Sequence, residues 1–281
     1  MSIRLSIVTP SYNQAVYLEE TLRSVISQRE HLHEYFVIDG GSTDDSPDII
    51  RAHGADIDYW VSEKDSGQSD AIHKGFSRAT GDYVLWLNSD DVLLPGALAK
   101  AKAALEAHPR WDALTGYHVR IDGASRLLSA HRIPGESPRA ARWGIHHVIQ
   151  QTCFFRRTLY EQLGGLDLSL HCVMDTDLWC RAFDAGSVWG HLPEYLAGFR
   201  QHPAAKGSDA TWLAMYRAEE QMLREKYPQY CAENGKHRLG LLTYRAGQIL
   251  SGRHLMARRD ARRWRGKTLA EVFHDLRPPL P

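Results

Sequence analysis

The chain has 281 residues, 43% of them hydrophobic, and its 34 Lys and Arg balance its 34 Asp and Glu. This length suits one large domain or two small ones with a real core. Zero net charge argues against a nucleic-acid binder that works through bulk electrostatics. The charge is uneven, however, because from Lys236 onward eleven Lys or Arg face three Asp or Glu, a surplus of eight. Residues 1–235 carry the matching deficit.

The cysteines and the apolar runs bear on the compartment. The four cysteines, at positions 153, 172, 180 and 231, form no CxxC pair, which predicts reduced thiols rather than disulfides or zinc ligands. Residues 1–7 enter a strand without signal-peptide architecture, and no apolar run approaches the length of a membrane span. We therefore expect a cytoplasmic protein, at most peripheral on the inner face of a membrane.

The first hundred residues alternate between two kinds of hydrophobic pattern. Strands are predicted at 5–9, 34–39, 57–62 and 83–87, and helices at 17–26, from Pro47, at 69–79 and at 96–107. This alternation implies a largely parallel sheet with helices on both faces. Loops rich in Asp, Asn, Ser and Gly follow the strands, so they gather at the sheet edge where ligands bind.

Beyond Trp111 the pattern is looser. Strands are predicted at 113–122 and 151–156, with a mostly extended stretch at 188–199, and helices at 159–163, 176–185 and 211–227. Residues 125–142 read as polar and irregular, and a basic tail ends the chain. There is no internal repeat.

The strand at 83–87 ends abruptly in polar residues, Asn88, Ser89, Asp90 and Asp91. Two adjacent carboxylates at the tip of a buried strand repel each other and are costly to desolvate. A hard divalent cation with oxygen ligands is the simplest positive partner for them. The alternative is that both carboxylates only cap the helix that follows Pro95.

The loops after the first two strands suit a nucleotide, although the chain has neither GxGxxG after its first strand nor GxxxxGK[ST]. Tyr12, among the small polar residues that follow Pro10, can stack on a base and bond to it. Asp39 precedes glycines that let the backbone approach a ligand. For each loop alone, ordinary turn chemistry is the alternative.

The segment 63–75 crowds Asp65, Gln68, Asp70 and Lys74 into one loop and the first turn of a helix. A polar pocket for a ribose or a sugar is one interpretation. An i,i+4 pair between Asp70 and Lys74 is the structural alternative.

Taken together, these strings resemble the family 2 glycosyltransferases of the GT-A fold. The resemblance covers residues 3–205 and rests on the following strings: Ile7-Val-Thr-Pro-Ser-Tyr-Asn-Gln14, Val37-Ile-Asp-Gly-Gly-Ser-Thr-Asp-Asp-Ser46, Glu63-Lys-Asp-Ser-Gly-Gln-Ser-Asp-Ala71, Leu87-Asn-Ser-Asp-Asp91, Gln151-Thr-Cys-Phe-Phe-Arg-Arg157, Met174-Asp-Thr-Asp-Leu-Trp-Cys-Arg181 and Phe199-Arg-Gln-His202.

The resemblance implies a Rossmann-like, mostly parallel sheet flanked by helices, with a nucleotide-sugar-binding half at 1–110 and an acceptor half at 111–205. Residues 206–281 form a helical, basic extension. The implied activity is inverting transfer of a hexose from a nucleotide-sugar, most often a UDP-sugar, to a hydroxyl of a saccharide or lipid-linked saccharide. Surface polysaccharide or glycolipid biosynthesis is the implied setting.

The family's nucleotide residues carry over position by position. Pro10, Tyr12, Asn13 and Asp39 match positions that hold the nucleoside, and Asp65 and Lys74 match the middle wall of the site. Gln68 and Asp70 fall where donor or acceptor sugars are contacted. Asn88, Ser89 and Asp90 stand at the DxD motif, where the last residue ligates Mn²⁺ or Mg²⁺ and the first reaches the ribose. Asn88 departs from the strict motif, and without its charge we expect lower metal affinity.

Two further positions carry over from the later strings. Asp175 matches the general base, and Asp177 is a close alternative that would contact donor or acceptor. Helical geometry puts the two on different faces, so only one can point into the site and the other would be structural. His202 resembles a late histidine that completes metal coordination; a strand-end histidine with a structural partner is the alternative.

Two other functions compete with this one. A nucleotidyltransferase would need a Gly-rich basic signature after the first strand, where Pro10-Ser-Tyr-Asn13 stands instead. A sugar-nucleotide-binding protein without catalysis would not need both Asp90 and Asp175.

The basic tail supports a further hypothesis. Residues 253–267 hold six Arg and one Lys around Leu255, Met256 and Trp264. Such a segment can lie on an anionic membrane surface. The alternative is a solvated helix face, or one paired with the acidic sheet domain.

Overall fold

The computed structural model describes residues 2–136, 138–142, 148–203, 210–231 and 235–273. They contain one nine-stranded sheet in the order β3-β2-β1-β4-β8-β6-β9-β5, with β7 paired to β6. The strands are β1 (Leu5–Ser11), β2 (Glu34–Asp39), β3 (Tyr59–Ser62), β4 (Tyr83–Trp86), β5 (Val92–Leu93), β6 (Ala113–Ile121), β7 (Leu127–His131), β8 (Phe154–Arg156) and β9 (Trp189–Arg200).

The two halves of the sheet differ in direction. β3, β2, β1 and β4 are mutually parallel, as the alternating pattern predicts. Beyond β4 the sheet is mixed, since β8 runs antiparallel to β4 and β6, whereas β6 and β9 are parallel. β7 also lies antiparallel to β6 in a hairpin that needs only a short turn and no helical crossover. β7 falls in a stretch that the sequence predicts to be irregular.

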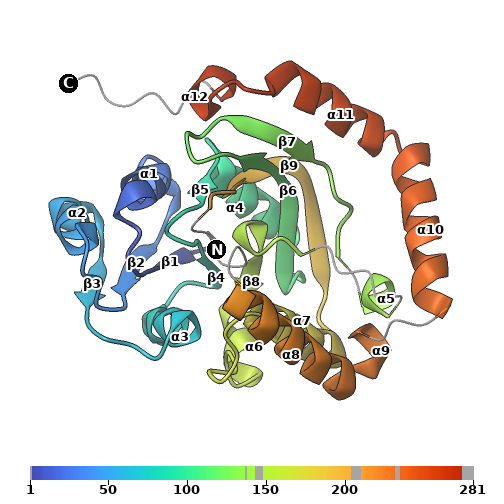
Figure 1. The fold of residues 1–281 in the computed structure, drawn as a ribbon, viewed down its shortest axis with the longest axis horizontal. Helices are drawn as coiled ribbons and strands as arrows, with labels where there is room; N and C mark the ends of the chain where they lie inside the picture. Colours follow the sequence, from blue (N-terminus) through green and yellow to red (C-terminus); the bar gives the residue numbers. More distant parts are fainter. Residues whose placement is uncertain (1, 137, 143–147, 204–209, 232–234, 274–281) are drawn as a thin grey trace.

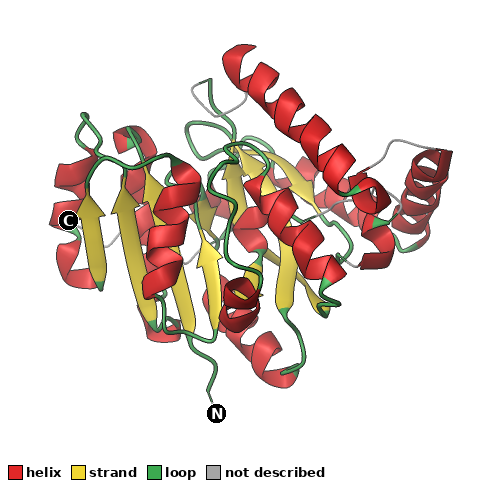
Figure 2. Ribbon diagram, turned by 90° about the horizontal axis from the view of Figure 1, so that it is seen from below, coloured by secondary structure: helices red, strands yellow, loops and turns green. Residues whose placement is uncertain are grey.

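Helices cover both faces of the sheet, as Figure 2 shows. Val8 packs toward α3 and α7, while its neighbour Ile7 packs toward α1 and α4. The helices are α1 (Ala15–Ile26), α2 (Ser46–Ala52), α3 (Gln68–Arg78), α4 (Ala97–Ala107), α5 (Pro138–Ala141), α6 (Arg157–Gln162), α7 (Met174–Asp184), α8 (Ala210–Lys226), α9 (Pro228–Cys231), α10 (Gly235–Leu250), α11 (Arg253–Trp264) and α12 (Leu269–Val272).

The start of α4 bears on the two adjacent carboxylates. Gly96 precedes the helix in the left-handed conformation, with φ +72°, and no side chain caps its first turn. The short strand β5 lies between Asp91 and this helix. The interpretation of Asp90 and Asp91 as helix caps is therefore wrong.

The C-terminal part of the chain forms two structural pieces. α8 and α9 pack on the main body beside α7, and α10 to α12 form an arm along the outside of the molecule (Figure 1). α11 lies on β7, where Trp264 contacts Tyr195 and Phe273 with ring centroids 5.4 and 5.6 Å apart. Trp264 therefore faces the sheet. The tail hypothesis assumed that this ring is available for a membrane surface, and that part of it is wrong.

Two expectations about compartment can be compared with the described residues. Cys153, Cys172 and Cys180 are free thiols, as expected, while the side chain of Cys231 lies outside the described residues. Within the described ranges, none of the helices combines the length and apolarity that a membrane crossing requires.

Candidate active site

Two adjoining cavities open at the carboxyl edge of the parallel strands. The first, the Asp90 cavity, has a volume of about 600 Å³, and the second, the Asp175 cavity, about 560 Å³. Both are lined by Gln68 and Asn88, and Gln68 Nε2 donates to Asn88 Oδ1 at 2.7 Å. The loops after the strands thus meet at one edge, as the alternating pattern predicts.

The Asp90 cavity collects half of the residues predicted for the site. Tyr12 lies at its wall with 61% of its surface exposed, so its ring is open to stacking. Burial raises the pKa of Asp65, whose carboxylate lies so close to Gly40 that an added Cβ would sit 2.7 Å from Oδ2. The predicted residues that line this cavity are Pro10, Tyr12, Asp65, Gln68, Asn88, Ser89 and Asp90.

Asn13 and Asp39 do not line either cavity but hold the adjoining loops. Asp39 is fully buried and accepts hydrogen bonds from the Ser42 backbone N–H and the Ser62 hydroxyl, at 2.9 and 2.6 Å. Asn13 Oδ1 accepts from the Thr43 N–H at 2.9 Å. Both side chains therefore tie the loops after β1, β2 and β3 together.

Asp70 and Lys74 are also outside both cavities. They form the i,i+4 ion pair of the structural alternative, with 3.5 Å between Lys74 Nζ and Asp70 Oδ2. Lys74 also pairs with Glu63 at 3.3 Å, and Asp70 accepts from the Ser66 N–H at 3.0 Å. These contacts brace the loop that carries Asp65.

The adjacent carboxylates Asp90 and Asp91 have different environments. Asp91 is 1% exposed and accepts hydrogen bonds from Asn88 Nδ2, Gln151 Nε2 and the Arg200 N–H, at 3.1, 2.7 and 2.8 Å. Burial, together with the charge of Asp90, raises the pKa of Asp91 against the effect of these donors. Asp90 instead lines the cavity. Asp91 is thus a structural anchor and Asp90 the carboxylate that a ligand can reach.

A buried cation does lie near this strand end, but it is Arg200, which we did not single out from the sequence. Its Nε donates to the Asp90 carbonyl at 2.6 Å, and its guanidinium pairs with Glu20 at 2.6 Å. Arg200 thus pairs with Glu20 and contacts the backbone, rather than the carboxylate, of Asp90. The arginine in Phe199-Arg-Gln-His202 was the available signal.

Asp90 and His202 together could hold a divalent cation. His202 Nε2 lies 3.1 Å from Asp90 Oδ2, and the buried His202 Nδ1 has no hydrogen-bond partner. Carboxylate oxygen and imidazole nitrogen suit Mn²⁺. In the described part of the chain no group of three or more His, Cys, Asp or Glu could form a metal site. The described residues therefore offer two metal ligands, and further coordination positions would have to be filled by a bound molecule.

Asp175 and Asp177 are separated as helical geometry requires. Asp175, in the first turn of α7, lines the Asp175 cavity. Asp177 is fully buried outside both cavities and forms ion pairs with Arg181 and Lys226, each at 2.8 Å. The Tyr227 hydroxyl also donates to it at 2.9 Å. Asp177 therefore fastens α7 to the end of α8, which is the structural role foreseen for one of the pair.

α8 closes over the site, which the sequence did not predict. Trp212 lines both cavities from this helix. Glu219 is buried and accepts from three backbone N–H groups at the start of α7, those of His171, Cys172 and Val173, at 2.9, 2.8 and 3.1 Å. A carboxylate at a helix N-terminus is stabilised by the helix dipole, so Glu219 anchors α8 beside Asp175.

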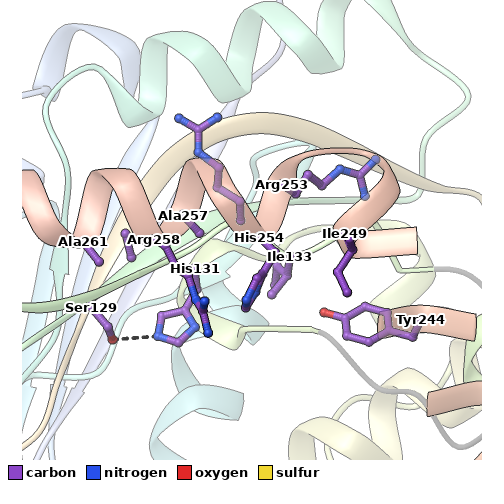
Figure 3. A pocket seen from close by; sticks show the side chains of 12 residues that line it. Ser129, His131, Ile133, Tyr244, Ile249, Arg253, His254, Ala257, Arg258 and Ala261 are labelled. Carbon is purple, nitrogen blue, oxygen red and sulfur yellow. Dashed lines mark hydrogen bonds between the residues drawn. The ribbon is translucent and has the colours of Figure 1, made fainter. Parts of the chain in front are cut away.

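A third cavity, of about 490 Å³, lies under the arm between β7 and the helices α10 and α11 (Figure 3). Ser129 and His131 are hydrogen bonded there at 2.8 Å, and Arg253 and His254 approach from α11. Among the described residues that line it there is no Asp or Glu. Of these three cavities, the two at the sheet edge are therefore the ones whose described lining includes a carboxylate.

Comparison with known proteins identifies the family. The protein-family model described as Glycosyl transferase family 2 matches residues 6–164, more than half of the chain. This chain belongs to glycosyl transferase family 2. An uncharacterized glycosyltransferase from Mycobacterium tuberculosis is 33% identical to this family 2 chain over 183 residues, covering 63% of this chain and 68% of that protein.

Solved structures agree on the fold. Staphylococcus aureus TarS in complex with UDP-GlcNAc superposes with a TM-score of 0.62 at 18% identity, over 84% of this chain and 69% of that one. The mannosyltransferase PcManGT from Pyrobaculum calidifontis, in complex with GDP-Man and Mn²⁺, gives 0.59 at 20% identity, over 90% and 76%. The predicted GT-A fold is confirmed.

Proposed function

We propose that this family 2 glycosyltransferase transfers a sugar, with inversion, from a UDP-sugar to an acceptor hydroxyl with the help of Mn²⁺ or Mg²⁺. One observation carries the proposal: two adjoining cavities share the wall formed by Gln68 and Asn88, and a carboxylate lines each of them, Asp90 (with Asp65) in one and Asp175 in the other. The nucleotide-sugars bound to TarS and PcManGT, and the Mn²⁺ of the latter, support it.

The donor would occupy the Asp90 cavity. Pro10 and Tyr12 would face the base, and Asp65 would line the nucleotide wall. Asp90 and His202 would hold the divalent cation. When bound, such a cation neutralises the charge that grows on the leaving diphosphate.

The acceptor would enter the Asp175 cavity. Asp175 would take the proton of the acceptor hydroxyl while the hydroxyl oxygen forms a bond to the anomeric carbon of the donor sugar. The bond from that carbon to the diphosphate oxygen breaks on the opposite face, so the configuration inverts. Glycosidases need a second carboxylate as acid. A diphosphate already leaves readily, so one base suffices.

The acceptor would be a saccharide or a lipid-linked saccharide. For a lipid-linked acceptor, the arm formed by α10 to α12 is where we propose contact with a membrane. Arg258, Arg259, Arg262 and Arg263 are exposed on α11, and none of them forms an ion pair with a described residue. Among the described residues, α11 forms an ion pair through its Asp260, which contacts Arg132 of the loop after β7. Leu250 and Leu255 beside this face are 87% and 65% exposed. We propose that this face contacts an anionic membrane on its cytoplasmic side; the side chains of Lys236, Arg238, Arg245 and Arg277 lie outside the described residues.

The deciding experiment incubates the protein with UDP-GlcNAc, UDP-glucose or GDP-mannose, with Mn²⁺ or with EDTA, and follows free nucleotide and the anomer formed. We expect turnover with a UDP-sugar that stops in EDTA. Donor binding without turnover would indicate a binding protein, and synthesis of a UDP-sugar from UTP and a sugar phosphate would indicate a nucleotidyltransferase. Either result would overturn the proposal.

A further inference from the structure

The Asp175 cavity contains an unusual concentration of polar atoms without partners. Among the described residues, nine buried side-chain nitrogen or oxygen atoms have no hydrogen-bond partner. Four of the nine belong to residues that line this cavity: both ring nitrogens of His118, Nε of Arg120 and Oε1 of Gln150. A buried polar atom left unpaired costs free energy, so their gathering in one cavity indicates a place for a ligand.

The side of this cavity formed by β6 is positively charged, because Arg120 lines it. Arg120 forms no ion pair or hydrogen bond with any described residue, and its buried Nε is one of the unpaired atoms. His118 stacks on His131 with ring centroids 4.6 Å apart. Burial, followed by the neighbouring His131 and Arg120, lowers the pKa of His118 to about 3, so the ring is neutral and can donate one N–H. An unpaired cation beside a neutral donor is complementary to an anion.

Two charged residues are found in the described lining of this cavity, and they belong to different elements. Arg120 comes from β6 and Asp175 from α7, and they do not pair with each other. A ligand carrying a negative charge is repelled by Asp175 and attracted by Arg120. Such a ligand is therefore oriented, with its acid group on the β6 side and its other groups free to reach α7.

We infer that the acceptor carries an acid group, a sugar-acid carboxylate or a phosphate, which Arg120 and His118 bind in the Asp175 cavity. The inference rests on the proposed function, since it takes this cavity as the acceptor site. The planar guanidinium suits a carboxylate or phosphate because it can donate two parallel hydrogen bonds. Binding of the acid group at Arg120 places a neutral hydroxyl, rather than a second charge, at Asp175.

The test measures binding of three glycosides by calorimetry, with the protein saturated with UDP and Mn²⁺. The probes are methyl glucuronide, methyl glucoside 6-phosphate and the neutral methyl glucoside. We expect at least one charged glycoside to bind about tenfold or more tightly than the neutral one. Whichever charged probe binds more tightly tells the carboxylate from the phosphate. Arg120→Gln should remove the preference, and Arg120→Lys should retain part of it.

The matched control is Arg259→Gln, which removes the same charge from the exposed face of α11 and should keep the preference. The inference is overturned if neither charged glycoside binds more tightly than the neutral one, or if Arg120→Gln keeps the preference. It is also overturned if Arg120→Gln weakens UDP binding equally, because Arg120 would then serve the donor. Failure of the proposed function looks different: the unmodified protein would not turn over any nucleotide-sugar.

Discussion

Asp175 and Asp177 stand two residues apart in α7, yet one lines a cavity while the other is fully buried against Arg181 and Lys226. This division leads to the first prediction. Asp175→Asn should lower kcat by roughly 10²–10⁴-fold, because an amide cannot accept the acceptor's proton. The melting temperature and the affinity for the UDP-sugar should stay unchanged.

Asp177→Asn is the matched control for that variant. It weakens the ion pair with Lys226 that joins α7 to α8 and the pair with Arg181 within α7, so it should reduce the free energy of unfolding by about 3 kcal/mol, measured by urea titration. The opposite pattern, an active Asp175→Asn and a stable but inactive Asp177→Asn, would reverse the two roles.

The second prediction concerns the metal. Asp90→Asn should bind Mn²⁺ more weakly, because a charged oxygen ligand is replaced by a neutral amide. A calorimetric titration of Mn²⁺ into a mixture of the protein and UDP measures the change in Mn²⁺ affinity. Asp91→Asn should affect stability more than Mn²⁺ affinity, since Asp91 is buried under three donors. Equal Mn²⁺ affinity in Asp90→Asn and the unmodified protein would contradict the assignment.

The third prediction concerns the closure of α8. Glu219→Gln replaces a carboxylate that accepts from three backbone N–H groups, so α8 should dock about 1–3 kcal/mol less tightly. Hydrogen exchange in 210–226 should accelerate, and kcat/KM for the acceptor should fall. The neighbouring Glu220→Gln breaks only the exposed i,i+4 pair with Arg224 and serves as the control. Similar exchange rates in both variants would remove the anchoring role.

The fourth prediction follows from the stacked histidines. Burial lowers the pKa of His131 to about 4 in the folded protein, whereas an unfolded histidine titrates near 6.5. Between these values the folded chain binds fewer protons, so stability is complete above pH 6.5 and is lost as the pH falls toward 4. His131→Phe should flatten this loss by on the order of 1 kcal/mol in urea titrations. His254→Phe, at an exposed position of α11, should leave the pH dependence unaltered.

The fifth prediction tests the membrane contact of α11. The protein should pellet with phosphatidylglycerol vesicles at low salt and be released at high salt, because each cation near an anionic surface contributes roughly 1 kcal/mol. Changing Arg258, Arg259, Arg262 and Arg263 to Gln should abolish pelleting without unfolding the protein, since none of them pairs with a described residue. Undiminished pelleting of that variant, or none by the unmodified protein, would exclude this surface.

Local patterns in the sequence were enough for the parallel half of the sheet and for most of the Asp90 cavity. Strands β1, β2 and β4 bury both faces, so their apolar runs are continuous and their ends are marked by polar loops. Parallel strands bring those loops to one edge, which is why Tyr12, Asp65 and Asn88 meet. β7 was missed because its residues alternate weakly and its pairing with β6 is a tertiary contact.

Other residues of the site could not be assigned from local pattern. His118 and Arg120 alternate with the apolar Tyr117, Val119 and Ile121, which is a signal for two faces but not for what each face meets. The packing of α7 and α8 on the sheet turns the polar face into the Asp175 cavity. Glu219 and Trp212 reach the site only because α8 returns to α7 from later in the chain.

The sequence by itself determined that Asp175 and Asp177 point to different faces of a helix, since residues two apart in an α-helix are separated by about 200° around its axis. It also determined that two carboxylates end the central strand. Only the tertiary structure decided which member of each pair lines a cavity. Asp177 forms an ion pair with Lys226 and accepts a hydrogen bond from Tyr227. Asp91 accepts hydrogen bonds from Asn88, Gln151 and Arg200. A carboxylate surrounded by such donors is satisfied by the fold, whereas Asp90 and Asp175 face cavities because the tertiary packing leaves space before them.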